Sequence, residues 1–308
     1  MTKKGQDKSE EGAEASVRNC YSTWGQTYYE EYYGPDAPYP PVHLDLVKSL
    51  LKRFGARRIL DAGCGPASMM RHLGSDLALY GFDLTPQMVA EAQRVLMAQG
   101  VPESHIWEGS VLDRAAYVAP DGLAEFDSIV CCGVLPHIPP SHDATVIENI
   151  KHGLRPGGYA VVEARNELFS LFTLNRYSHQ FFMKSLIPTG ALSAKAGKEQ
   201  GKLNQALEQV EGMFRIDLPP LRKGKASEPG YDEVLSRTHN PLLLRQQFEE
   251  TGFEDVRLFF YHFHSLPPMV GGLVPRLFRE TSLDMERNPQ DWRGMFMASA
   301  FFIVAKRP

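Results

Sequence analysis

The chain reads Ile59-Leu60-Asp61-Ala62-Gly63-Cys64-Gly65-Pro66-Ala67-Ser68 at the point that decides its fold. An apolar strand ends at Asp61, a glycine-rich turn follows it, and a helix comes next. The next apolar run ends in Gly81-Phe82-Asp83-Leu84, so a second acidic residue closes a second strand. Parallel sheets bind nucleoside cofactors at the carboxyl ends of their strands in this way. We therefore expect an α/β fold with a nucleoside site at that edge.

Apolar runs and helical spacings alternate on both sides of this turn. Helical spacing over residues 42–54 precedes the strand at 58–62, and Thr85-Pro86 is expected to begin a helix. Such alternation implies right-handed crossovers and a parallel sheet. Further strands are expected at Leu77–Phe82, His105–Glu108, Phe126–Cys132, Tyr159–Ala164, Val256–Phe263 and Ala298–Ala305, with Leu154–Gly158 as a turn and Ser141 and Asn240 as helix N-caps.

Composition divides the chain into five segments. The polar start predicts disorder, the tyrosine-rich segment after it predicts an aromatic lid, and two later segments interrupt the strand–helix rhythm. For the tyrosine-rich segment, a helix packed through its aromatic face and a lid over a ligand both remain open. The expected segments are a disordered tail at 1–16, the lid at 17–40, a cofactor-binding core at 41–164, a substrate cap insertion at 165–238, and completion of the core at 239–308 with an insertion at 266–296.

The bulk numbers describe an ordinary globular chain. Of 308 residues, 43% are hydrophobic and 23% charged, and the formal net charge is −4. Nothing global favours nucleic acid or a membrane as a partner, and neither a signal peptide nor an apolar run of membrane-spanning length is visible. The four cysteines lack metal-ligand spacing, so we expect reduced thiols, no metal site and a cytoplasmic location.

Several motifs together give the chain a family resemblance. Asp61-Ala62-Gly63-Cys64-Gly65, Asp83, Glu108–Asp113, Phe126–Val130 and Leu154–Gly158 follow one another in the order and spacing of the class I S-adenosylmethionine-dependent methyltransferases, which the chain resembles. The resemblance covers roughly residues 40–165 and 240–305. It implies a Rossmann-like, seven-stranded, mostly parallel sheet with an antiparallel last strand, to which the irregular segment adds a helical substrate cap.

The resemblance also implies a cofactor site. Glycines at 63 and 65 let the backbone turn tightly against a ligand, and Asp83 is placed to accept both ribose hydroxyls. The family often has a third glycine where this chain has Ala67, and usually an acidic residue where it has Ser110. The residues expected to contact S-adenosylmethionine are Asp61, Gly63, Gly65, Asp83, Leu84, Ser110, Val111, Cys132 and Tyr28.

A nicotinamide dinucleotide is the rival cofactor. It favours Gly-x-Gly-x-x-Gly before a helix whose first backbone N–H groups hold pyrophosphate. Here the third glycine position is Ser68, and Pro66 removes one of the N–H groups. S-adenosylmethionine is therefore the expected cofactor.

Candidate catalytic residues follow the fourth and fifth strands. His137, in the loop after the fourth strand, is a candidate base, although a packing role is equally consistent with the sequence. Glu163 and Arg165 end the fifth strand, where Arg165 suits a substrate carboxylate or phosphate, or an ordinary salt bridge. Lysines in the cap would suit an anionic acceptor or simply form a solvated surface.

The expected function is methyl transfer to a small-molecule acceptor, with a hydroxyl of a sugar or secondary metabolite favoured. Two alternatives stay open. The first is other S-adenosylmethionine chemistry, such as aminocarboxypropyl transfer or cyclisation, which releases methylthioadenosine. The second is a non-catalytic binding protein on the same fold. The oligomeric state does not follow from the sequence.

Overall fold

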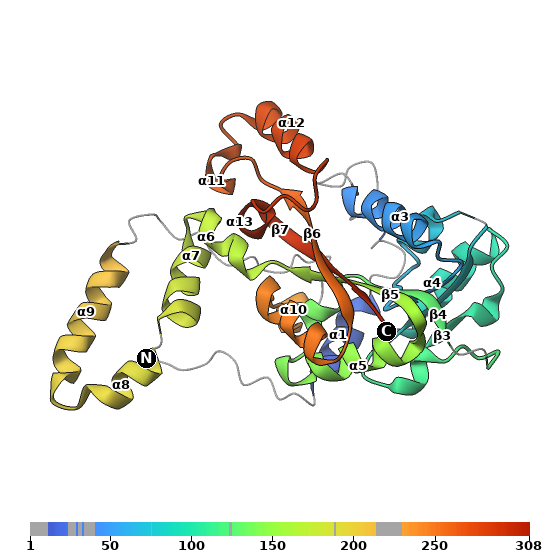
Figure 1. The fold of residues 1–308 in the computed structure, drawn as a ribbon, viewed down its shortest axis with the longest axis horizontal. Helices are drawn as coiled ribbons and strands as arrows, with labels where there is room; N and C mark the ends of the chain where they lie inside the picture. The colour runs from blue at the N-terminus through green and yellow to red at the C-terminus, as the bar shows by residue number, and fades with distance from the viewer. Residues whose placement is uncertain are drawn as a thin grey trace.

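A computed structural model describes residues 12–23, 29, 33, 41–74, 76–122, 125–187, 189–213 and 230–308. At its centre lies a seven-stranded sheet in the order β3-β2-β1-β4-β5-β7-β6 (Figure 1). Strand β7 runs antiparallel to both neighbours, and the other strand pairs are parallel. The predicted fold class is confirmed. The strands are β1 Arg58–Ala62, β2 Ala78–Asp83, β3 Ile106–Glu108, β4 Phe126–Cys131, β5 Leu154–Arg165, β6 Glu254–Phe263 and β7 Ala298–Lys306.

Helices cover both faces of the sheet. Helices α3 (Val42–Phe54) and α4 (Pro86–Met97) pack on one face, and α5 (Asp143–Gly153) and α10 (Pro241–Glu250) pack on the other. Successive strand residues point to opposite faces, so Ile129 and its neighbour Val130 lie in different cores. Burial on both faces explains why the central strands read as continuous apolar runs.

Helix ends follow the local sequence signals. Asn240 caps α10 by accepting the backbone N–H of Leu242, and Pro241 takes the first helical position, as predicted. Gly55 ends α3 with a positive φ of 63°. Ser141 does not cap α5, because Pro139 and Pro140 lead into a short 3-10 turn and the helix starts two residues after Ser141.

Two other boundaries differ from the prediction. Strand β5 begins at Leu154, because Leu154 pairs with Phe126 before the irregularity at the glycines that follow. Helix α1 spans Ala13–Tyr21, so residues 13–16 are helical although they fall in the predicted tail. Contacts with the distant strand β3, which a local sequence window does not contain, hold this turn of helix.

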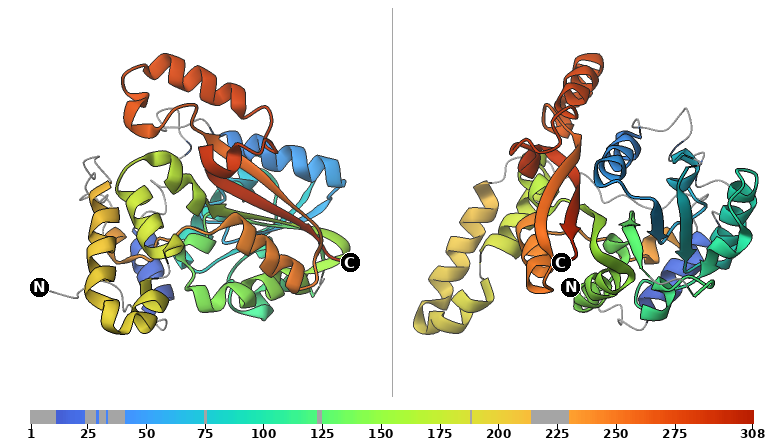
Figure 2. Two further views of the ribbon diagram at one scale, coloured as in Figure 1. Left: turned by 60° about the vertical axis from the view of Figure 1, so that its left-hand side comes forward. Right: turned by 45° about the vertical axis from the view of Figure 1, so that its right-hand side comes forward.

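The two insertions form helices outside the sheet. The first contains α6 (Ser170–Thr173), α7 (Arg176–Phe181), α8 (Thr189–Ala196) and α9 (Gln200–Met213), and the second contains α11 (Pro268–Gly271), α12 (Pro275–Met285) and α13 (Gly294–Met297). Figure 2 shows α8–α9 and α11–α12 projecting from different sides of the sheet. Among the residues described, no helix is long and apolar enough to cross a membrane.

Candidate active site

A cavity lies at the carboxyl edge of the sheet, where β1, β2, β3 and β4 end. Helix α1 contributes four residues to its lining. The cavity brings together eight of the nine residues expected to contact the cofactor, and also the candidate base His137. Tyr28 is the ninth and lies outside the described residues. The lining residues are Ala13, Glu14, Val17, Tyr21, Tyr33, Asp61, Gly63–Pro66, Ser68, Met69, Phe82–Thr85, Met88, Gly109–Leu112, Cys132–Val134, His137–Pro139 and His142.

The glycine turn forms the floor of the cavity. Gly63 has a φ of 82°, and a Cβ there would come within 2.4 Å of the Val134 side chain, so only glycine fits. Gly65 also has a positive φ, 52°, but a Cβ there would meet no atom within 4 Å. Ala67 adopts a φ of 59°, which explains why glycine is often found at its position. The turn thus presents bare backbone to the space above Gly65.

Asp83 is fixed by the backbone around it. Its Oδ2 accepts the N–H of Gly65 at 2.9 Å, and its Oδ1 accepts the N–H of Thr85 at 2.9 Å. Burial nevertheless raises the pKa of Asp83, and these hydrogen bonds only partly oppose that shift. The Thr85 hydroxyl adds a third hydrogen bond to this carboxyl. The remaining acceptor capacity of the carboxylate is left for a ligand donor.

Asp61 is more deeply buried than Asp83, with 3% of its surface exposed. Burial, followed by repulsion from Asp83, raises the pKa of Asp61 to about 8. No described group donates a hydrogen bond to its carboxyl. Two buried acids thus share one cavity whose described lining contains no Lys or Arg. A cationic ligand would relieve their repulsion.

Another part of the cavity lining combines apolar walls with polar side chains. Leu84 and Val111 supply apolar walls, and the Ser110 hydroxyl lies beside them. Ser110 Oγ donates to a carboxylate oxygen of Glu14 on α1 and accepts the N–H of Leu112 at 3.0 Å. Glu14 was not among the residues expected from the sequence, because it lies 96 positions from Ser110.

His137 forms a hydrogen-bonded pair with Tyr21 of α1. Its Nδ1 lies 2.6 Å from the Leu235 carbonyl oxygen, and its Nε2 lies 3.1 Å from the Tyr21 hydroxyl. A carbonyl only accepts, so Nδ1 carries the hydrogen and Nε2 accepts from Tyr21. Burial lowers the pKa of His137 to about 4, so the imidazole is neutral near pH 7. A neutral imidazole whose Nε2 accepts a hydrogen bond from Tyr21 can take up a proton through that hydroxyl.

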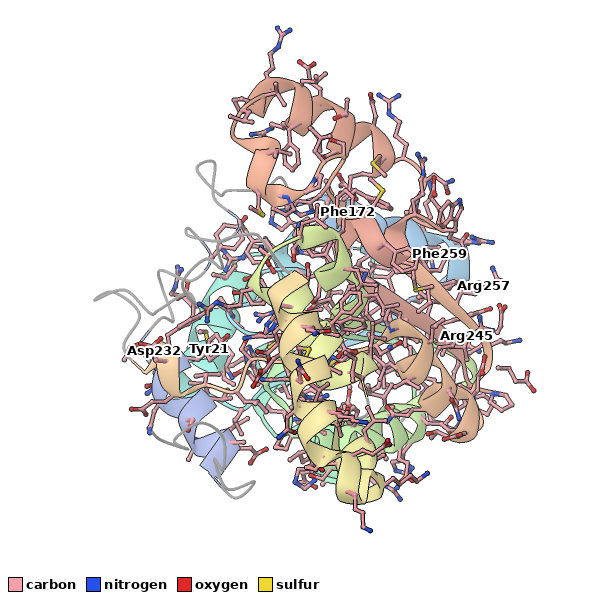
Figure 3. The ribbon with its side chains drawn as sticks, turned by 90° about the vertical axis from the view of Figure 1, so that its left-hand side faces the viewer. Tyr21, Phe172, Asp232, Arg245, Arg257 and Phe259 are labelled. Carbon is pink, nitrogen blue, oxygen red and sulfur yellow. The ribbon has the colours of Figure 1, made fainter. Side chains whose placement is uncertain are left out.

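Loop 230–239 supports this pair from outside. A Cβ on Gly230 would lie 3.6 Å from the Cα of Cys20, the residue before Tyr21. In the view of Figure 3, the labels of Asp232 and Tyr21 fall on the same part of the molecule. Further along, Arg237 donates from its backbone to Pro136 and from its side chain to Ile138. The loop therefore holds both α1 and the His137 turn.

Glu163 and Arg165 do not line the cavity. Glu163 is buried and accepts the backbone N–H of Gly133, so it holds the loop that follows β4. Arg165 is exposed and donates to Ser236 in loop 230–239. Its charge contributes to lowering the pKa of His137. These two catalytic candidates thus lie outside the lining of the cavity that contains His137.

Two other sequence features are also placed. Cys132 lines the cavity, and burial raises the pKa of its thiol, so it is not a thiolate nucleophile. The cap lysines Lys195, Lys198 and Lys202 lie exposed on or beside α8 and α9, and no described residue of 165–238 lines the cavity. Among the described residues, no cluster of His, Cys, Asp and Glu is placed to hold a metal.

The comparison with protein families decides the identity of this domain. Residues 59–158 match the family model described as a methyltransferase domain, which contains the turn, Asp83 and the His137 loop. Residues 59–158 are a methyltransferase domain of the class I S-adenosylmethionine-dependent type. The predicted family, enzyme class and cofactor are confirmed at this level.

Curated relatives of this methyltransferase are distant. The "Ubiquinone biosynthesis O-methyltransferase" of Xylella fastidiosa is 28% identical over 166 residues, which cover 51% of this chain and 62% of that protein. The protein of the same name from Bordetella avium is 22% identical over 206 residues, 62% of this chain and 80% of that protein. The match thus spans less than two thirds of the length of the Xylella relative.

Solved structures support the fold. Magnesium protoporphyrin IX methyltransferase from Synechocystis PCC 6803, solved with S-adenosylhomocysteine, superimposes with a TM-score of 0.50 at 15% identity. The alignment covers 96% of this methyltransferase and all of that chain. At this identity the likeness concerns the fold alone.

The cavity of this methyltransferase fits S-adenosylmethionine on its own evidence. The described lining contains two acids, Asp61 and Asp83, and no Lys or Arg, and the sulfonium and ammonium groups of the cofactor would favour the ionised form of both acids. The Ser68 hydroxyl is buried in the lining and has no hydrogen-bond partner among the described residues, which leaves it available to a polar ligand group. The open space above Gly65 gives the ligand room.

Proposed function

We propose that this methyltransferase transfers the methyl group of S-adenosylmethionine to a hydroxyl of a small-molecule acceptor, such as a sugar or another secondary metabolite. The observation that carries the proposal is the position of the Tyr21–His137 pair, which opens onto the same cavity as Asp61, Gly65 and Asp83. A cofactor held by the acids and an acceptor held by the pair would therefore meet in one enclosed space.

The residues divide the work as follows. S-adenosylmethionine supplies an electrophilic methyl group when bound. Asp83 accepts the ribose hydroxyls, and Asp61 offsets the positive charge of the methionine end. As the acceptor oxygen attacks, its proton passes to the Tyr21 oxygen while Tyr21 donates its own proton to Nε2 of His137. Glu163 holds Gly133, at the start of the loop that contains His137.

Oxygen is proposed as the acceptor atom for two reasons. The relatives from Xylella and Bordetella carry the name O-methyltransferase. Moreover, a neutral histidine paired with a tyrosine is useful to a nucleophile that arrives protonated, as an alcohol or phenol does near pH 7. An anionic acceptor has less support, because the described lining contains no Lys or Arg.

Product analysis tests the reaction. The purified protein is incubated with S-adenosylmethionine and a panel of phenols and sugars, with the amine of the same skeleton beside each hydroxyl compound. We expect S-adenosylhomocysteine and an O-methylated product. Release of methylthioadenosine would assign aminocarboxypropyl transfer or cyclisation instead, and failure to bind S-adenosylmethionine in calorimetry would assign a non-catalytic role.

A matched pair of variants tests the mechanism. Tyr21→Phe removes the hydroxyl that joins the acceptor to His137, and kcat should fall by roughly 10²-fold or more while the Kd for S-adenosylhomocysteine changes little. Tyr29→Phe is the control, because Tyr29 makes the same kind of hydrogen bond to His72, 2.8 Å long, outside the cavity lining. Equal losses of kcat in both variants would contradict the assigned proton path.

A further inference from the structure

Helix α1 presents one face to the cavity. Glu14, Val17 and Tyr21 are three and seven positions apart in sequence, so they lie on the same side of the helix, and all three line the cavity. Tyr21 belongs to the end of the cavity that contains His137. Glu14 lies at the opposite end, beside the apolar walls formed by Leu84 and Val111.

The hydrogen bonds at this end leave one strong acceptor. The Ser110 hydroxyl gives its hydrogen to Glu14 and accepts the N–H of Leu112. Glu14 uses Oε1 for that contact, and no described residue donates to its Oε2. Arg18, one turn along the same helix, forms its ion pair at 2.8 Å with Glu108 and not with Glu14. The Glu14 carboxylate therefore keeps most of its capacity as an acceptor.

The chemistry of a purine explains what this acceptor can select. Adenine carries a 6-amino group, which donates hydrogen bonds, and a 6-oxo purine carries an oxygen at the same place, which only accepts. A carboxylate beside that position attracts the amino group and repels the oxo group. A buried polar mismatch of this kind discriminates between ligands more strongly than a missing apolar contact does.

We propose that Glu14 recognises the base of the cofactor: its carboxylate, held by Ser110, accepts a hydrogen bond from the 6-amino group of adenine and excludes 6-oxo purines. This inference rests on the proposed cofactor site but not on methyl transfer. It places a specificity-determining residue on a helix that precedes the family-matched segment 59–158.

Calorimetry with two ligands tests the proposal. S-adenosylhomocysteine and S-inosylhomocysteine differ only in the 6-amino and 6-oxo groups and in the hydrogen on the neighbouring ring nitrogen. The wild type should bind the adenosyl compound more tightly. In Glu14→Ala, affinity for the adenosyl compound should fall roughly 10- to 100-fold with little change for the inosyl compound. In Glu14→Gln, the amide N–H should improve binding of the inosyl compound and narrow the preference.

Arg18→Ala provides the matched control. It removes the ion pair between α1 and Glu108 but no cavity-lining group, so any loss should be small and equal for both ligands. An unchanged ratio of the two affinities in Glu14→Ala would overturn the proposal, and so would tighter binding of S-adenosylhomocysteine, which would mean that Glu14 blocks the site. If the wild type binds neither compound, the proposed cofactor site itself is wrong. That result differs from an unchanged ratio of affinities in Glu14→Ala, which would contradict only the role of Glu14.

Discussion

Asp83 shows how a single side chain can serve both the fold and the ligand. Its two oxygens receive the N–H groups of Gly65 and Thr85, so the carboxylate joins the glycine turn to the start of α4. These contacts fix the direction of the remaining lone pairs before any ligand arrives. Such preorganisation lowers the entropy that binding would otherwise cost.

Replacing this side chain should weaken cofactor binding. In Asp83→Ala, the affinity for S-adenosylhomocysteine should fall by roughly 1.5–3 kcal/mol, the scale of hydrogen bonds to a charged group. Calorimetry measures the change. Asp113→Ala is the control, because Asp113 accepts a backbone N–H at the start of a 3-10 turn but does not line the cavity. An unchanged Kd in Asp83→Ala would show that the ribose contact is misassigned.

At the scale of elements, the glycine turn between β1 and the following helical turn assigns different tasks to its two glycines. A Cβ at Gly63 would collide with Val134, whereas a Cβ at Gly65 would point into open space in the cavity. Gly63 is thus required for packing between the turn and the loop after β4, and Gly65 keeps room for the ligand.

The two alanine variants should therefore fail differently. Gly63→Ala combines a positive φ with a clash and should lower the free energy of unfolding by roughly 2–4 kcal/mol. Gly65→Ala has only the positive φ and should lower the free energy of unfolding by roughly 1–2 kcal/mol. Relative to this smaller loss of stability, its loss of affinity for S-adenosylhomocysteine should be larger than that of Gly63→Ala. Urea unfolding and calorimetry give the two quantities. A larger stability loss in Gly65→Ala would reverse these roles.

Elements with strong local signals were predictable from the sequence. The apolar run at 58–62, the Asn240-Pro241 start of α10 and the Gly55 stop of α3 all lie where expected. Leu154 was misassigned to a turn because the glycines at 157 and 158 outweigh the pairing of Leu154 with Phe126, which only the folded sheet reveals.

The cofactor side of the candidate site was predictable for the same reason. Its residues follow strand ends, and parallel strands bring their carboxyl ends to one edge. Tyr21 and Glu14 were not predictable, because their partners lie 116 and 96 positions away and no periodicity encodes such a contact. The contact of Arg165 with Ser236 was not predictable, because the end of a strand does not fix the direction of a long side chain.

At the scale of the whole molecule, burial in the folded state shifts the pKa of several acids and histidines away from their ordinary values. Burial raises the pKa of Asp61 to about 8 and that of Glu286 to about 7, and it lowers the pKa of His43, His137 and His262 to about 4. The acids make the folded state bind more protons than the unfolded chain, and the histidines make it bind fewer.

Stability should therefore fall as pH rises through neutrality. Between pH 4 and 7 the two sets of groups oppose each other. The unfolded histidines are half protonated at about pH 6.5 and mostly neutral above about pH 7, where the acids dominate. Protons held by folded Asp61 are lost as pH approaches 8, so the free energy of unfolding should decrease by about 1 kcal/mol between about pH 7 and 8. Urea unfolding across this range measures the slope.

Two variants and one ligand test which group makes the free energy of unfolding depend on pH. Asp61→Asn should flatten that dependence, and Glu286→Gln should change the slope mainly below pH 7. Saturating S-adenosylmethionine should also flatten it, because a cation near Asp61 lowers the pKa of that carboxyl. A slope that persists in Asp61→Asn would place the titrating group elsewhere.

Helix α1 touches both ends of the cavity. Glu14 and Tyr21 are two helical turns apart, about 10 Å along the axis, and they contact Ser110 and His137 respectively. A cofactor lying between those contacts would be sealed in by the same helix that completes the proton path. Substrates would then bind in a compulsory order, with the cofactor first and the acceptor second. The demethylated nucleoside would leave last, at a rate set by the movement of helix α1 away from the cavity.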